Sequence, residues 1–254
     1  MRTHRRLTRA ALTAVAAVLA LTGAVTAAPA AESPAALGPG AYSVHGIDIS
    51  RYQHPGNKAI DWGRVSRSGQ KFVSVKATEG TRTVSPWFVR DLAGARSVRM
   101  IHTAYHYFDP AQDGRLQADH FLSTVGRQHL DGHQPYQLPL ELDLEGPCKV
   151  GPGAFESRVL AFLNRVEAAT GVEPVVYTQR SYVNHCMAGS KALGKYRVRL
   201  ARYSNNPPPA LPGGTGWHFW QFTEKATVPG VPAKTDENVF NGSYQALRNL
   251  ANLR

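Results

Sequence analysis

Residues 140–146, LELDLEG, give the clearest indication of both the fold and the chemistry of this chain. Leucines and acidic residues alternate along this stretch, and successive side chains of a strand point to opposite faces. Glu141, Asp143 and Glu145 therefore share one face, about 7 Å apart per two-residue step, while the leucines face the other way. A strand with this pattern is expected to project its acids into a polar cleft.

Strand-like and helical patterns alternate on both sides of this stretch. Strands are predicted at 43–49, 72–77, 100–107, 138–144, 174–177, 198–201 and 217–223. Helices are predicted from an Asp61 cap to about Gly69, over 86–97, from an Asp113 cap, over 154–169 before Gly171, and from Ser243. This alternation predicts a parallel sheet with right-handed crossovers in one α/β domain, and we prefer a closed barrel to an open sheet.

Acidic residues recur at the predicted strand ends, where barrels of this kind carry their chemistry. Asp48 ends the first strand and Glu79 follows the second, while Asp143 and Glu145 lie at the end of the fourth. Two carboxyls in one cleft cannot both ionise freely, so one keeps a proton that it can donate while the other stays charged. Glycoside hydrolysis needs this division of roles, because the leaving oxygen is protonated while positive charge builds on the sugar ring.

The same acids are also compatible with two roles outside proton transfer. They could form a solvated rim, or they could hold a hard cation such as Mg²⁺ or Ca²⁺. His102 and His106 share one face of the third strand, but neither belongs to a recognised metal-binding spacing. We therefore expect structural or sugar-contacting histidines and neither a metal nor another cofactor.

Aromatic residues gather near the predicted end of the barrel. Trp217, Phe219 and Trp220 lie beside Gln221, and flat apolar rings next to amide groups suit sugar rings. Aromatic residues also supply much of the apolar area of protein cores, so a core position is an equal alternative for this cluster.

The first 41 residues have a composition of their own. Four arginines within residues 1–9 precede an apolar run over 10–28 and small residues that end at Ala30, which is the layout of a secretory signal peptide. A membrane anchor is the weaker alternative, because Pro29 closes the run and no basic stop-transfer cluster follows it. We expect a signal peptide over 1–30, a Pro/Gly linker over 31–41, a catalytic barrel over 42–254, and a secreted, extracellular protein.

Composition and charge narrow the function classes further. The 254 residues are 43% hydrophobic and include 2 Cys, which excludes disordered and disulfide-dense classes. The chain has 29 Lys+Arg and 18 Asp+Glu, and without the four arginines of residues 1–30 the balance is 25 against 18, or +7. No zinc-finger spacing or helical basic stripe appears, so we expect no nucleic-acid partner. We expect a monomer whose positive charge suits anionic cell-wall polymers.

Cys148 and Cys186 are the two cysteines. An oxidising compartment favours one disulfide between them, and two free thiols are the alternative.

Seven short motifs between about Val44 and Gly242 resemble, in order, those of the glycoside hydrolase family 25 muramidases, the Ch-type lysozymes. They are GIDIS with Gln53 at 46–53, KATEG at 76–80, AYHYF at 104–108, LDLE at 142–145, PVVYT at 174–178, WxxWQ at 217–221 and DENVF at 236–240. The resemblance implies an irregular TIM-like (β/α)5(β)3 barrel in a single domain. It also implies a lysozyme that hydrolyses the β-1,4 bond between N-acetylmuramic acid and N-acetylglucosamine in bacterial peptidoglycan.

The resemblance also implies roles for individual residues. Glu145 would be the proton donor, and Asp143 would orient or stabilise the 2-acetamido group of the sugar, a group that could itself act as the nucleophile. Asp48 and Asp236 would be the two further acids of the cleft. The residues expected to bind substrate are Tyr105, Tyr177, Trp220, Gln221 and Glu79.

This chain departs from the family at two places, and three rival functions stay open. It reads Val-Arg-Leu-Ala at 198–201, where the family often has Trp, and Ser85-Pro86, where the family often has Asp-Pro.

The rival functions are another amino-sugar glycosidase, such as a glucosaminidase or a chitinase-like barrel, a non-catalytic wall-binding barrel, and a metal-dependent barrel hydrolase. Substrate-assisted retention is the preferred mechanism, and inversion through a water is the alternative.

Overall fold

Eight strands close into a ring in the computed structural model, which describes residues 38–253. The ring closes where β1 (His45–Ile49) pairs with β2 (Phe72–Glu79) on one side and with β9 (Thr235–Phe240) on the other. The strands between them, in ring order from β2, are β4 (Ile101–Tyr107), β5 (Glu141–Asp143), β6 (Val175–Thr178), β7 (Arg197–Ala201) and β8 (Phe219–Ala226). The expected closed barrel is confirmed, with the short β3 (Thr83–Val84) as an antiparallel addition to β2.

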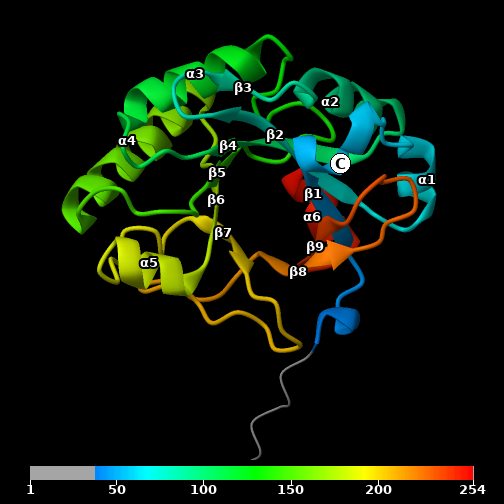
Figure 1. The fold of residues 1–254 in the computed structure, drawn as a ribbon. Coiled ribbons are helices and arrows are strands. Elements are labelled where there is room, and N and C mark those ends of the chain that lie inside the picture. The colour runs from blue at the N-terminus through cyan, green and yellow to red at the C-terminus, as the bar shows by residue number, and fades with distance from the viewer. Residues whose placement is uncertain (1–37, 254) are drawn as a thin grey trace, which may run out of the picture. The chain divides into compact units, whose positions relative to one another are not determined.

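One helix follows each of the first five ring strands, whereas β7, β8 and β9 succeed one another with no helix between them in the described chain. All ring pairs from β1 to β8 are parallel, and β9 runs antiparallel to both of its neighbours. The five helices are α1 (Trp62–Arg67), α2 (Phe88–Ser97), α3 (Gly114–Gly126), α4 (Pro152–Thr170) and α5 (Arg180–Cys186). They lie around the outside of the ring in Figure 1. This order is the expected (β/α)5(β)3 arrangement.

The predicted helix ends are confirmed by their capping contacts. The Asp61 and Asp113 carboxylates accept hydrogen bonds from the backbone N–H groups three residues on. Ser243 caps α6 (Tyr244–Leu250) in the same way. Gly171 ends α4 in the left-handed conformation, with φ at 70°, which a residue without Cβ adopts at little cost.

Four elements differ from the prediction. β9, β3 and α5 were not among the segments predicted from local pattern, and β5 is only three residues long where a strand over 138–144 was expected. Residues 137 and 138 pair with β4 through a single bridge at His102, and Pro139 next to them has no N–H to donate to a ladder. The short β5 still points its acids inward, so the predicted face is preserved.

An apolar cluster closes the barrel at the N-terminal ends of its strands. Its members are Val44, Phe72, Ile101, Leu138, Phe219 and Phe240 from the barrel and Leu247 and Ala251 from and after α6. Figure 1 shows α6 behind the strands. Gly46 is required in this layer, because a Cβ there would lie 2.5 Å from the ring of Phe72. This end of the barrel is therefore closed, and access to its interior lies at the opposite end.

The predicted signal peptide and residues 31–37 of the predicted linker lie outside the described residues. The rest of the linker is described, and Pro39–Ala41 form a 3₁₀ turn there. Among the helices of residues 38–253, none has both the length and the apolar character needed to cross a membrane.

Candidate active site

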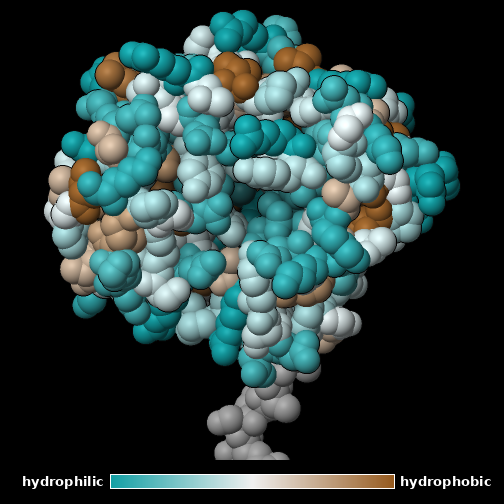
Figure 2. Space-filling model, in the orientation of Figure 1, coloured by the Kyte–Doolittle hydropathy of each residue, from teal (hydrophilic) through white to brown (hydrophobic). Residues whose placement is uncertain are grey.

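A polar cleft of about 430 Å³ opens at the C-terminal ends of the ring strands. Figure 2 shows it as a hollow of mostly hydrophilic residues near the centre of the face in view. The predicted site residues that line it are Asp48, Glu79, Tyr105, Asp143, Glu145, Tyr177, Gln221 and Asp236. The structure thus brings together all four predicted acids and four of the five residues expected to bind substrate.

The strand pleat explains how the acids reach the cleft. Glu141 and Asp143 on β5 line it, as does Glu145 two residues beyond the strand, while Leu142 is buried in the core on the other face. Asp143 is 5% exposed, and Glu145 is only partly buried. The predicted common face of the three acids is confirmed.

Asp143 and Glu145 hold their protons more tightly than free carboxyls do. Burial raises the pKa of Glu145, and the charge of Asp48 raises it further, against the opposing effect of the Lys76 ammonium. Burial also raises the pKa of Asp143 well above its ordinary value, and the nearby charges of Glu145 and Glu141 act in the same direction. Because two buried carboxyls cannot both ionise at low cost, ionisation of one opposes ionisation of the other.

Asp48 and Asp236 form a second carboxyl pair across β1 and β9, where they are directly opposite. Asp48 Oδ2 accepts hydrogen bonds from Gln221 Nε2 at 3.0 Å and from Asn238 Nδ2 at 2.8 Å. Burial, the charge of Asp48 and a hydrogen bond with it raise the pKa of Asp236 to about 9. The hydrogen-bond donors thus converge on Asp48, whereas Asp236 keeps its proton at neutral pH.

Gln221 joins the two carboxyl pairs. Its Oε1 accepts hydrogen bonds from the hydroxyls of Tyr177 and Tyr203, both at 3.0 Å, while its Nε2 donates to Asp48. The Tyr177 hydroxyl also lies 3.5 Å from Glu145 Oε2. Gln221 was predicted to bind substrate, but its carbonyl oxygen is already engaged and its position is that of a bridge within the cleft.

Arg199 on β7 was not among the predicted site residues, although it lies in one of the two segments where this chain departs from the family. Its Nε and Nη2 donate to Glu141 Oε2 at 3.0 and 2.8 Å, and Nη1 lies 3.9 Å from Asp48 Oδ2. The side chain is 1% exposed and contacts Glu141, which lines the cleft. Strand alternation places Arg199 inward, and that signal was available in the sequence.

Trp220 is the one predicted substrate contact that the structure does not bring to the cleft. It is fully buried, its Nε1 donates to the Arg202 carbonyl, and its ring packs edge-on against Trp217 and Tyr42. Trp220 and Gln221 are neighbours on β8, and neighbouring strand residues face opposite sides. The expected sugar contact at Trp220 is corrected to a core position.

His102 and His106 point away from the cleft. His106 is buried, hydrogen-bonds to Thr78 and Gln117, and stacks on Phe162 of α4. Burial lowers the pKa of His106 to about 3 and that of His102 to about 4, so both rings are neutral structural groups. In residues 38–253 no three His, Cys, Asp or Glu side chains are arranged to hold a metal ion.

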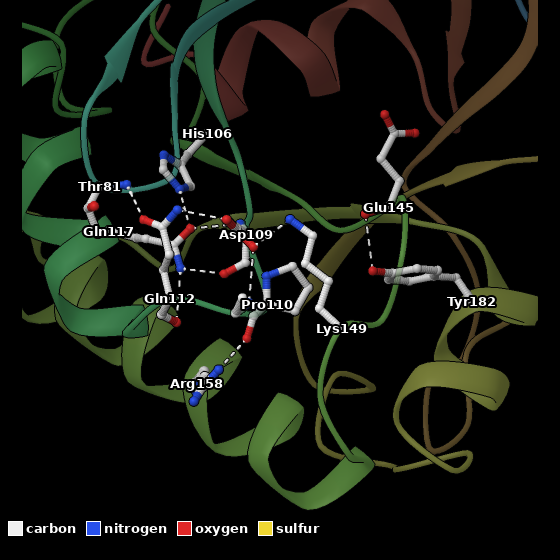
Figure 3. Close-up of polar contacts among 11 residues, drawn as sticks. Thr81, His106, Asp109, Pro110, Gln112, Gln117, Glu145, Lys149, Arg158 and Tyr182 are labelled. Atoms are coloured by element: carbon white, nitrogen blue, oxygen red, sulfur yellow. Dashed lines mark hydrogen bonds and ion pairs between the residues drawn. The ribbon is translucent and has the colours of Figure 1, made fainter.

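Three contacts fix the loop that carries Glu145, and Figure 3 shows two of them. The Tyr182 hydroxyl on α5 donates to the Glu145 carbonyl at 3.1 Å, and Lys149 Nζ donates to Asp109 Oδ1 at 2.9 Å. The third is the Cys148–Cys186 disulfide, with an S–S distance of 2.01 Å, which ties the same loop to the end of α5. The predicted disulfide is therefore present, beside the predicted acid.

Two smaller hollows share lining residues with the cleft. Glu145 also lines a hollow with Gly146, Gln179 and His185, and Glu79 lines another with Arg82. Each hollow therefore adjoins the central cleft.

Comparison with known proteins gives a consistent result. The sequence model of glycosyl hydrolases family 25 matches residues 47–231. The N,O-diacetylmuramidase of Arthroderma benhamiae is 34% identical over 242 residues, which cover 92% of this chain and 96% of that protein. Lysozyme M1 of Streptomyces globisporus is 33% identical over 82% of this chain and 71% of its own length. The structure of a bacterial lysozyme from Streptomyces coelicolor matches with a TM-score of 0.75 and 30% identity, covering 84% of this chain and 99% of that one.

Proposed function

The chain belongs to glycosyl hydrolases family 25, and from this we propose that it is a secreted lysozyme that hydrolyses the β-1,4 bond between N-acetylmuramic acid and N-acetylglucosamine in bacterial peptidoglycan. The observation that carries the proposal is the position of Glu145. Burial raises the pKa of this carboxyl, and Glu145 lines both the central cleft and a neighbouring hollow.

Glu145 is the general acid in the proposed reaction. It donates its proton to the glycosidic oxygen while the bond from that oxygen to the anomeric carbon breaks. In the retaining route the acetamido oxygen of the same sugar attacks the anomeric carbon and forms an oxazolinium. A water molecule then attacks this carbon and gives a proton to Glu145, which restores the enzyme. In the inverting alternative, water attacks in the first step.

Asp143 is placed to hold the acetamido group. Its Oδ1 is buried and has no hydrogen-bond partner among the described residues, so it can bond with the N–H of a sugar in the cleft. In the proposed reaction the proton shared by the Asp143 and Glu145 pair is on Glu145, where the leaving oxygen needs it. Tyr105 and Tyr177 line the same cleft and offer ring faces and hydroxyls to the sugar.

Several features support a polymeric, extracellular substrate. Glu145 lines two adjoining hollows, which offer space for sugars on both sides of the bond to be cut. The disulfide suits an oxidising compartment, in agreement with the predicted signal peptide. The charge of +7 without residues 1–30 favours attraction of a monomeric enzyme to anionic wall polymers.

Mass spectrometry of fragments released from purified peptidoglycan tests the proposal. Muramic acid at the new reducing ends is the expected result, whereas glucosamine there would identify a glucosaminidase. Binding to the insoluble wall without new reducing ends would identify a binding module. Loss of activity in EDTA, restored by added metal, would identify a metal-dependent hydrolase.

A further inference from the structure

A buried ion pair lies directly below the carboxyls of the cleft. Arg199 and Glu141 are 1% and 3% exposed, and two nitrogens of the guanidinium contact the same carboxylate oxygen. The guanidinium carbon also lies 5.1 Å from the ring centre of Phe219 and 5.7 Å from that of Phe72, in the apolar layer below. Burying two charges is costly even when they are paired, so the fold alone does not account for a pair at this position.

The two charges face different carboxyls. Arg199 Nη1 is buried without a hydrogen-bond partner among the described residues, and it is directed toward Asp48 Oδ2 at 3.9 Å. Glu141 precedes Asp143 by one pleat of the same strand, and its charge opposes ionisation of Asp143. A cation beside one acid and an anion beside the other favour different protonation states of the two.

We propose that Arg199 and Glu141 are a positioning pair that fixes which cleft carboxyl carries the negative charge. Arg199 holds Asp48 as the anion, and Glu141 opposes the loss of both protons from the Asp143 and Glu145 pair. This inference rests on the proposed function, and it identifies the groups that prepare the cleft for general-acid catalysis. The charged and titratable groups that line the cleft with Glu141 include Asp48, Lys76, Tyr105, Asp143, Glu145, Tyr177 and Asp236.

The test is the pH dependence of kcat/KM for the release of reducing ends from peptidoglycan by the full chain. Arg199→Met removes a cation, makes the nearby carboxyls harder to ionise, and moves the profile to higher pH by about one unit. Glu141→Gln removes an anion and moves the profile to lower pH by a similar amount. Arg199→Lys keeps the charge and leaves the profile in place. A purely structural role would lower activity without displacing the profile in opposite directions.

Two further variants keep the test decisive. If Arg199→Met does not fold because Glu141 loses its partner, the double variant Arg199→Met/Glu141→Gln removes both buried charges, and its profile lies between those of the single changes. Asp119→Asn, which removes one charge from the 2.6 Å surface pair with Arg165, is the matched control and leaves the profile in place. Displacement in one common direction, or none in any variant, overturns the inference.

Carboxyl ¹³C titration by NMR separates this inference from the proposed function. The titration of Asp48 and Asp143 moves upward in Arg199→Met and downward in Glu141→Gln, and in the double variant it lies between the two, whether or not peptidoglycan is the substrate. Unchanged titration in an active enzyme overturns only the positioning pair. Displaced titration in an enzyme that releases no reducing ends overturns only the lysozyme proposal.

Discussion

The two ends of the barrel are built from the same strands and have opposite character. At the N-terminal end, Phe72, Phe219 and Phe240 fill the interior with apolar rings. A few residues further along, the inward positions hold acids, such as Asp48 and Asp143. One end supplies buried apolar area, and the other confines carboxyls that resist ionisation.

This difference separates stability from catalysis within one barrel. Apolar burial at the closed end lowers the free energy of the folded state, whereas burial of carboxyls at the open end raises it. Substitutions at the open end should therefore change the rate with little loss of stability. Substitutions at the closed end should do the reverse.

The largest expected effect is that of Glu145→Gln at the open end. The amide cannot donate the proton that the leaving oxygen needs, and general-acid groups contribute about 10²–10⁴-fold to rates. We expect kcat for reducing-end release to fall by at least about 100-fold while the thermal unfolding midpoint holds or rises.

Glu156→Gln on α4 is the matched control, because it makes the same change outside the cleft. Its activity should equal that of the unmodified protein. If Glu145→Gln kept activity within about threefold, the assignment of the acid would be wrong.

The second prediction concerns Phe240→Ala at the closed end. Phe240 is 7% exposed and lies 5.0 Å from the ring of Phe219, so truncation leaves a cavity. Changes of this kind cost about 3–5 kcal/mol. Denaturant titration should show this loss, while kcat per folded molecule should stay near that of the unmodified protein.

Val89→Ala, at a position that is 54% exposed on α2, makes a smaller truncation at the surface and should change stability by less than about 0.5 kcal/mol. A large fall in kcat of folded Phe240→Ala would show that the two ends are not independent.

The sequence predicted the elements whose local pattern is strong. Asp61, Asp113, Ser243 and Gly171 mark helix ends because capping depends on neighbouring backbone groups alone. The acids on β5 were predicted to share a face because the pleat has a fixed period of two.

What the sequence did not predict depends on contacts distant along the chain. β9 has three consecutive polar residues from Asp236 to Asn238, because its inward face joins the cleft, so no apolar alternation marks it as a strand. Asp236 was therefore assigned through the family resemblance alone. The partner of Arg199 is 58 residues away, and only barrel closure brings the two together.

The third prediction concerns the stability that the protein loses by burying Asp236 at the open end. A carboxyl whose pKa is raised in the folded state keeps its proton where the unfolded chain has lost it, so unfolding releases a proton. With the pKa of Asp236 raised to about 9, its contribution to the free energy of unfolding falls as pH rises from about 4 to about 9. Asp236→Asn mimics the protonated form and should stabilise the protein at pH 7 by about 2–4 kcal/mol.

Urea titrations across this pH range measure the effect. The gain from Asp236→Asn should disappear near pH 4, where Asp236 is protonated in both states. Asp119→Asn at the surface should show no comparable gain. A gain that is independent of pH would mean that Asp236 is ionised in the folded protein.

The smallest effect is expected for the surface ion pair that holds the loop carrying Glu145. Lys149 and Asp109 form an ion pair in which the lysine is 43% exposed, and exposed pairs contribute about 0.2–1 kcal/mol. Since Tyr182 and the disulfide also hold this loop, Lys149→Met should lower stability by less than about 1 kcal/mol and kcat by less than about twofold. Lys58→Met, on the exposed surface, is the control for loss of one lysine. A tenfold loss of kcat in Lys149→Met alone would show that the surface ion pair positions Glu145. The part of the barrel that contributes to catalysis would then include residues at its exposed rim.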